Sequence, residues 1–139
     1  MEEHISTVIQ DAEKMLEDAQ FLLENDRYES AVNRAYYAAF HCAQSLLQND
    51  DVLVKTHVGT RRKFSELFIK TGILPKTLGE YLAQLENYRM IADYSYGNEV
   101  SSNIAAKAVH NAAYFLAETK SYFKDVENKT DEPDKEQNQ

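Results

Sequence analysis

The chain has 139 residues, 43% of them hydrophobic, and a formal net charge of −8 at pH 7. This length supports one domain with a single core, and the acidic balance argues against the broad cationic surface that binds duplex DNA non-specifically. The single cysteine, Cys42, excludes an internal disulfide and a cysteine-based metal site.

Signals for export or for membrane insertion are missing from the sequence. The first residues lack a basic region followed by an apolar stretch, and nowhere do about 18 apolar residues follow one another. We therefore expect a cytoplasmic protein without membrane contact. Acids are concentrated in residues 2–26 and 126–139, so residues 27–125 hold twelve basic residues against ten acidic ones. That middle part can present a local anion-binding surface.

Apolar residues at three- and four-residue steps, with acids between them, predict an amphipathic helix over residues 5–23. Asn25 and Asp26 break this pattern, and a second helix is predicted from about residue 28 to about residue 48. One face of the second helix carries Arg34, Tyr37 and His41, which is unusual for a simple bundle. The opposite face is the predicted core face and consists of Val32, Ala35, Tyr36, Ala39, Cys42, Ala43 and Leu46.

The second half of the chain predicts three further helices. A loop through residues 55–57 leads to a short helix that ends at Thr71 and Gly72, and Pro75 marks the entry to a fourth helix. Arg89 lies close to the leucine stripe of this fourth helix, so we expect it to point inward or toward an interface. An alanine-rich fifth helix spans about residues 104–123.

These elements predict an all-α protein, with four long helices and one short helix in an up-and-down bundle over residues 1–125. Residues 126–139 are polar, charged and almost free of apolar side chains, so they cannot offset their own ordering entropy. They are predicted to form a disordered acidic tail.

Three segments resemble landmarks of small stand-alone prokaryotic HEPN proteins (higher eukaryotes and prokaryotes nucleotide-binding). These are AVNRAYYAAFH at residues 31–41 after NDRY at 25–28, then KTH at 55–57, then RMIADY at 89–94. The similarity covers roughly residues 5–125. It implies a helical bundle, like the substrate-binding subunits of nucleotidyltransferases, that dimerises and binds RNA or nucleotides. Such proteins are often encoded beside a minimal nucleotidyltransferase as a toxin–antitoxin pair.

The resemblance also implies a chemistry from which this chain departs. Catalytic HEPN proteins are metal-independent ribonucleases with an arginine followed four to six residues later by a histidine. After Arg89 the corresponding positions hold Asp93, Tyr94 and Ser95, and His41 follows Arg34 by seven residues. Catalytic residues are therefore left unassigned, and no cofactor or metal is expected.

Metal-free RNA cleavage needs a base, an acid and a cation on the phosphate. Arg89 together with His57 or His41 could assemble this set, since histidine titrates near neutrality, whereas Tyr94 could only donate hydrogen bonds or stack. The structural alternatives stay open. Arg89 and Asp93 can form an intrahelical pair worth roughly 0.2–0.5 kcal/mol, and His57 can brace the start of the short helix. The basic cluster of Lys55, Arg61, Arg62 and Lys63 can meet phosphates or form a solvated face.

We predict a homodimeric RNA- or nucleotide-binding protein that also contacts a nucleotidyltransferase-family partner. The candidate site lines a cleft and consists of Arg34, Tyr37, His57, Arg89, Asp93 and Tyr94. The alternative is a metal-independent toxin endoribonuclease with a variant active site, in which Asp93 and Tyr94 replace the usual histidine region.

Overall fold

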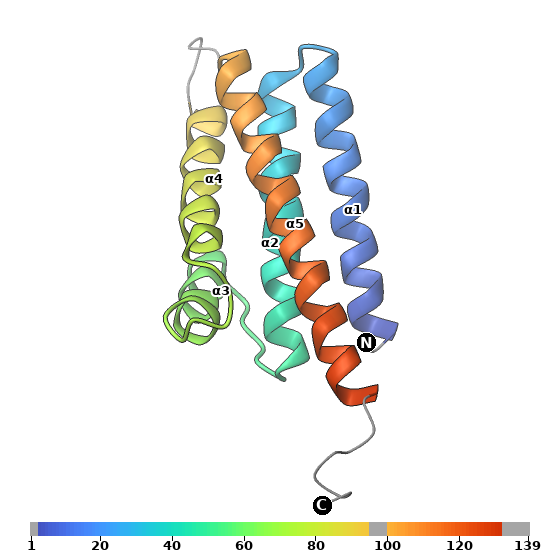
Figure 1. Cartoon of the computed structure of the whole chain (residues 1–139). Coiled ribbons are helices and arrows are strands. Elements are labelled where there is room, and N and C mark those ends of the chain that lie inside the picture. The colour runs from blue at the N-terminus through green and yellow to red at the C-terminus, as the bar shows by residue number, and fades with distance from the viewer. Residues whose placement is uncertain (1–2, 95–99, 132–139) are drawn as a thin grey trace, which may run out of the picture.

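The computed structural model describes residues 3–94 and 100–131, and within these ranges the chain is helical without strands (Figure 1). The elements are α1 (Glu3–Glu24), α2 (Tyr28–Asn49), α3 (His57–Phe64), a π-helical turn η1 (Ser65–Ile69), α4 (Lys76–Tyr94) and α5 (Ser102–Asp131). The prediction of an all-α fold with four long helices is confirmed. The predicted short helix is α3 followed directly by η1.

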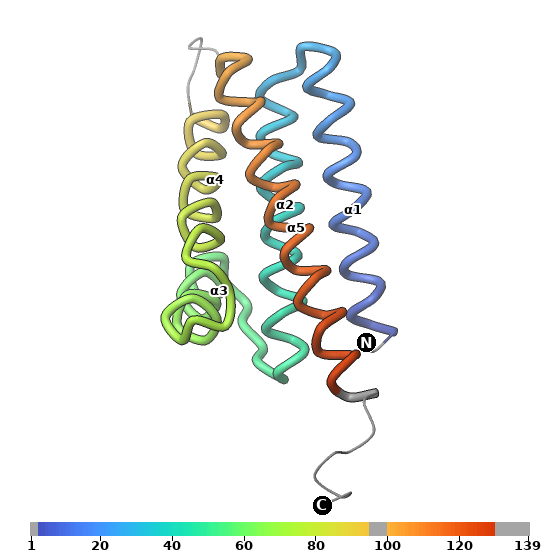
Figure 2. The backbone as a smooth tube through the Cα atoms, in the orientation of Figure 1, coloured from blue at the N-terminus to red at the C-terminus, as the bar shows by residue number. Residues whose placement is uncertain are grey.

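Successive long helices run in opposite directions, as the tube in Figure 2 shows. Helix α2 lies in the middle of the bundle and contacts α1, α3, α4 and α5. Helix α5 also contacts α1 and α4, so these three helices together cover one side of α2. On the other side, α1 and α4 lie at the two edges of α2. The chain therefore leaves one stripe of its central helix open between α1 and α4.

The sequence of α2 explains its central position. All seven side chains of the predicted core face are fully buried. Further side chains are buried on the flanks, because three long helices pack around α2 rather than one or two. Many of these buried residues are alanines, which allow neighbouring backbones to approach closely: Ala31, Ala35, Ala38, Ala39 and Ala43.

Local contacts set the start and the end of the α3–η1 unit. The Thr56 hydroxyl accepts a hydrogen bond from the Gly59 N–H at 2.9 Å, which caps α3. A Cβ on Gly59 would lie 2.6 Å from Val54 Cγ1 and 2.7 Å from Thr56 Oγ1, so a larger residue here would displace these side chains. The unit ends at Ile69, and the turn after it reaches Gly72, whose φ of +77° is favourable for glycine; the sequence predicted the end at Thr71 and Gly72.

Helix α5 is longer than the sequence predicted. It continues to Asp131, so residues 126–131, which were expected in the tail, are helical. Val126 follows Phe123 by three residues and is half-buried, which gives the extra turns an apolar contact face. Residues 132–139 lie outside the described residues, and for them the disordered tail stays a prediction. None of the described helices has a stretch long and apolar enough to cross a membrane.

Candidate functional site

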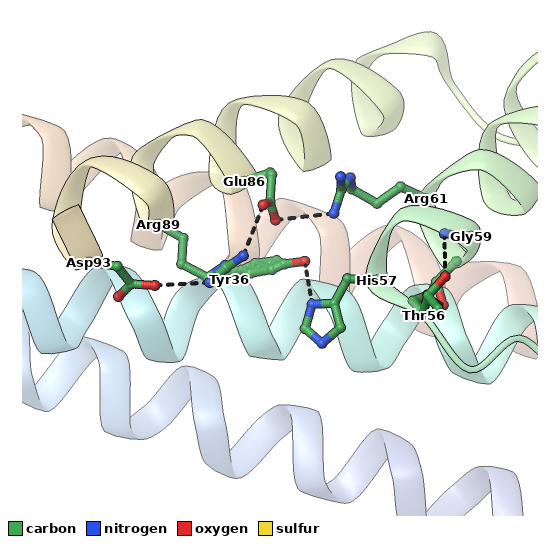
Figure 3. A network of polar contacts seen from close by, with 9 residues as sticks. Tyr36, Thr56, His57, Gly59, Arg61, Glu86, Arg89 and Asp93 are labelled. Atoms are coloured by element: carbon green, nitrogen blue, oxygen red, sulfur yellow. Dashed lines mark hydrogen bonds and ion pairs between the residues drawn. The ribbon is translucent and has the colours of Figure 1, made fainter.

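Tyr36 brings three helices together around one polar cluster (Figure 3). Its ring is fully buried in α2, as predicted. The Tyr36 hydroxyl oxygen lies 3.1 Å from Nδ1 of His57 at the start of α3. The guanidinium carbon of Arg89, on α4, lies 4.8 Å from the centre of the same ring, which is cation–π distance. We call Tyr36, His57, Arg61, Glu86, Arg89 and Asp93 the Tyr36 cluster.

Arg89 pairs with Asp93 within α4 and also points inward, so both expectations for this residue are confirmed. Its NH1 donates to Asp93 Oδ2 at 2.9 Å, so the intrahelical pair exists. Its NH2 donates to Glu86 Oε1 at 2.9 Å, and the side chain points inward over Tyr36 with 20% of its surface exposed. Burial disfavours the charge, but the hydrogen bond and the charge of Glu86, with a smaller contribution from Asp93, raise the pKa of Arg89. Arg89 is therefore a fixed cation.

Glu86 is the residue that joins two arginines. Its Oε2 lies 3.2 Å from NH1 of Arg61 on α3, while its Oε1 accepts from Arg89. Burial raises the pKa of this carboxyl, but hydrogen bonds from Tyr36 and Arg89 and the charge of Arg61 lower it overall. The four charged side chains Arg61, Glu86, Arg89 and Asp93 thus alternate in sign.

The Tyr36 hydroxyl stays protonated at neutral pH. Burial, together with the hydrogen bond and charge of Glu86, raises the pKa of Tyr36 to about 12. The hydroxyl therefore has one proton to donate within a cluster that offers two acceptors, the Glu86 carboxylate and the His57 imidazole. Which partner receives it depends on the tautomer of His57.

His57 is a neutral imidazole whose ring packs against aromatic side chains of α2. Burial lowers the pKa of His57, and the charges of Arg89 and Arg61 lower it further against the opposing effect of Glu86. The ring stacks on Phe40, with centroids 4.2 Å apart and 20° between the planes. Tyr37 presents its edge at 5.8 Å. His57 thus braces α3 against α2, while the N-terminal cap of α3 comes from Thr56.

The six predicted site residues fall into two groups. His57, Arg89 and Asp93 belong to the Tyr36 cluster, and Tyr37 contacts the rings of Tyr36 and His57. Tyr94 ends α4 one residue after Asp93 and is 68% exposed. Arg34 is exposed on the open side of α2, one turn before Tyr37, and no contact in the described part of the chain joins it to Arg89.

Sequence reasoning missed three members of the cluster. Tyr36 was correctly predicted in the core, but its hydroxyl was overlooked, although a buried tyrosine needs a hydrogen-bond partner. Glu86 precedes Arg89 by three residues, a spacing that indicates a helical ion pair. Arg61 was treated as part of a basic cluster that the structure divides: Arg61 contacts Glu86, and Lys63 lies 3.6 Å from the exposed Glu66.

His41 lies outside the Tyr36 cluster. It shares the open side of α2 with Tyr37, at 6.4 Å between ring centroids. Burial lowers the pKa of His41, against the opposing charge of Asp11 on α1. Within residues 3–94 and 100–131, no three histidine, cysteine, aspartate or glutamate side chains gather in a metal-binding arrangement.

The fold and the cluster together define a helical-bundle protein with an arginine-, histidine- and tyrosine-containing site between α2, α3 and α4. The family model described as "HEPN domain" matches residues 5–122. The chain therefore belongs to the HEPN family, as its sequence segments suggested.

Proteins similar to this chain come from archaea and bacteria. A candidate toxin of Methanocaldococcus jannaschii is 36% identical over 85% of this chain and 80% of its own length. A second candidate toxin from the same organism is 32% identical over 89% of this chain and 92% of its own length. A UPF0332 protein of Thermotoga maritima is 32% identical over 83% of this chain and 87% of its own length.

Proposed function

We propose that this protein is the HEPN member of a toxin–antitoxin pair and that the Tyr36 cluster with its surroundings binds RNA or a nucleotide. The partner in this proposal is a minimal nucleotidyltransferase. The toxin names of two relatives support the first part. The second part depends on one observation, the partly exposed Arg89 guanidinium held over the Tyr36 ring beside a neutral histidine.

Arg89 has donor capacity for a phosphate. A hydrogen bond from arginine to a phosphate is charge-assisted and strong. NH1 is bound to Asp93, whose side chain is 36% exposed, so a phosphate can displace this weakly held partner. NH2 stays with Glu86, and Nε is buried, so the contact with the phosphate is made through NH1.

The surface around the cluster supplies further recognition groups. Tyr37 and Tyr94 can stack on bases, since every base has a π face. Arg34 is an exposed cation, and in the described part of the chain it has no ion-pair partner. In the proposal, a phosphate chain runs from Arg89 along the open side of α2 toward Arg34.

The open side of α2 also supports the proposed homodimer. Tyr37 and His41 lie there half-buried, and Met90 and Tyr94 on the flanking α4 are 49% and 68% exposed. Exposed apolar and aromatic side chains are typical of interfaces. Sedimentation equilibrium should give a dimer that Tyr37→Asp converts to a monomer; a monomeric wild-type chain would remove this part of the proposal.

Binding is tested with the folded double variant Arg34→Ala/Arg89→Ala. Fluorescence anisotropy with labelled single-stranded RNA and with a labelled nucleotide should show a loss of affinity of about tenfold or more, the equivalent of about 1.4 kcal/mol. Pull-down should report on the partner nucleotidyltransferase. Lys107→Ala is the matched control, because Lys107 is an exposed cation on α5. If RNA, nucleotide and partner binding all stay unaltered in the double variant, the site assignment is abandoned.

A second candidate function is metal-independent RNA cleavage by a variant active site. One observation favours it: His57, which is neutral at pH 7, and the Arg89 cation contact the same tyrosine. His57 can accept the proton of a 2′-hydroxyl while Arg89 stabilises the charge that develops on the phosphate. In this candidate, Asp93 and Tyr94 take the place of the usual histidine region.

Cleavage of labelled RNA in EDTA tests this candidate. Activity should be lost in Arg89→Gln and in His57→Gln but retained in Lys107→Ala. Absence of cleavage across varied RNAs, together with normal growth on expression, would leave only the binding function.

A further inference from the structure

A cavity of about 420 Å³ lies between α3, η1 and the first half of α4. Its walls are apolar, with Phe64, Ile69 and Leu82 among the lining side chains. On the α4 side it is bounded by Gly79, against which the Ile69 side chain packs, and by the exposed Ala83 at its edge. The volume falls within the ~300–1,000 Å³ typical of small-molecule sites. The cavity is therefore large enough for a compact organic ligand.

Cations border this apolar space. Arg61 and Lys76 both line the cavity, and Glu80 is the acidic residue of the lining, so its formal charge is +1. Lys76 is exposed and has no ion-pair partner among residues 3–94 and 100–131. An apolar chamber with an excess of positive charge fits a ligand that has an apolar body and an anionic group.

Arg61 is only partly engaged by its present partner. Figure 3 shows it reaching from α3 toward Glu86 on α4. The closest approach is 3.2 Å, yet Glu86 Oε2 is buried without a hydrogen-bond partner, so the contact is an ion pair without good hydrogen-bond geometry. The Arg61 side chain is 26% exposed. Its guanidinium can therefore turn toward a second anion, and the buried Glu86 carboxylate competes with that anion for Arg61.

The wall of the cavity includes an unusual backbone element. Ser65 and Ile69, the first and last residues of η1, both line the cavity, and the Lys70 N–H donates to the Ser65 carbonyl at 2.8 Å. This five-residue spacing is that of a π-helix, which is rare and is frequently found at functional sites. The π-helical turn gives Phe64 and Ile69 a relative orientation that a regular α-helix would not provide.

We propose that this cavity binds a small amphipathic anion, with a flat apolar body between α3, η1 and α4 and one anionic group on Arg61. Binding draws Arg61 away from Glu86 and leaves Glu86 paired with Arg89. The cavity is thus linked to the Tyr36 cluster through one ion pair. Ligand binding in the cavity does not depend on the function proposed for the cluster.

Two probes with the same ring system separate the charge from the apolar body. 1-Anilinonaphthalene-8-sulfonate carries one sulfonate, and N-phenyl-1-naphthylamine lacks it. Fluorescence titration of the wild-type chain should show saturable binding of one sulfonate probe per chain, tighter than that of the neutral amine. Weakening the partner of Arg61 through Glu86→Gln should tighten sulfonate binding by about two- to fivefold, equal to ~0.4–0.9 kcal/mol.

Neighbouring positions provide matched variants. Arg61→Gln should weaken sulfonate binding about tenfold and leave the neutral amine unchanged, since one charge-assisted contact is lost. Arg62→Gln, which removes an exposed arginine outside the lining, should change neither. Ala83→Leu should weaken both probes by filling the cavity, while Ala117→Leu, at an exposed alanine of α5, should weaken neither.

Three results would overturn the proposal. Equal losses of sulfonate affinity in Arg61→Gln and Arg62→Gln would mean general surface attraction. Unchanged binding in an Ala83→Leu variant with wild-type circular dichroism would place the probes elsewhere. Absence of saturable binding to the wild-type chain would remove the site altogether.

Discussion

Glu86 allows the energetic importance of the Tyr36 cluster to be measured directly. Glu86→Gln keeps the size of the side chain but removes the charge that Arg61 and Arg89 share. Glu86 and Arg89 side chains are 15% and 20% exposed, so the pair lies between the exposed and the buried limits. Exposed pairs contribute about 0.2–1 kcal/mol, whereas breaking a buried pair costs about 3–5 kcal/mol. Arg89 keeps Asp93 and Arg61 can turn to solvent, which places the expected loss near ~2 kcal/mol.

The matched control is Glu66→Gln. Glu66 also pairs with a basic residue three positions away, but its ion pair with Lys63 spans 3.6 Å and both side chains are about half exposed (46% and 51%). We expect a loss below about 0.5 kcal/mol there. Urea unfolding followed by circular dichroism, at one protein concentration, gives both free energies from the midpoints and slopes. Equal, small losses in the two variants would refute the reasoning, because Glu86 would then be screened as fully as a surface carboxylate.

Three further predictions follow from individual contacts. Gly59→Ala should lower the free energy of unfolding by about 1–3 kcal/mol, as measured by urea unfolding, because the added Cβ meets Val54 and Thr56 within 2.7 Å; an unchanged midpoint would contradict the tight α3 start. Tyr36→Phe should cost about 1 kcal/mol, since it keeps the ring contacts and deletes only the hydroxyl, and NMR should show a changed titration of His57; an identical titration would mean that the 3.1 Å contact carries no coupling. The pKa of His57 is lowered in the folded chain, so as the pH falls the unfolded chain binds this proton first. The contribution of the neutral His57 to the free energy of unfolding is therefore complete above pH ~6.5 and declines as the pH falls further. His57→Gln should flatten that part of the stability–pH curve, and a curve identical to the wild type would refute the lowered pKa of His57.

Much of the fold could be predicted because the helices follow local rules. Asn25 with Asp26 and Thr71 with Gly72 break the apolar periodicity, and in the structure helices end one or two residues before these positions. The end of α5 was misjudged because the apolar pattern thins out there and a single half-buried Val126 extends the packed face. Helix boundaries in weakly patterned segments depend on tertiary contacts that local periodicity does not contain.

The candidate site was only partly predictable. Face geometry correctly suggested that Arg89 points inward, since the register of a helix determines which side chains share a stripe. The association of His57 with Arg89 was one of two options, because sequence spacing does not say which histidine lies near an arginine on another helix. The structure selects His57 and leaves His41 on the open side of α2.

The sequence by itself determined the all-α class, the number of long helices, the alanine-rich core face of α2 and, through its segments, the HEPN family. These properties depend on periodicity and turn chemistry, which act over a few residues. Only the tertiary structure decided that Tyr36, Glu86 and Arg61 complete the site and that a cavity forms beside it. Their side chains come from three helices, and their distances are set by how α3 and α4 pack on α2, which depends on the summed packing of the whole core.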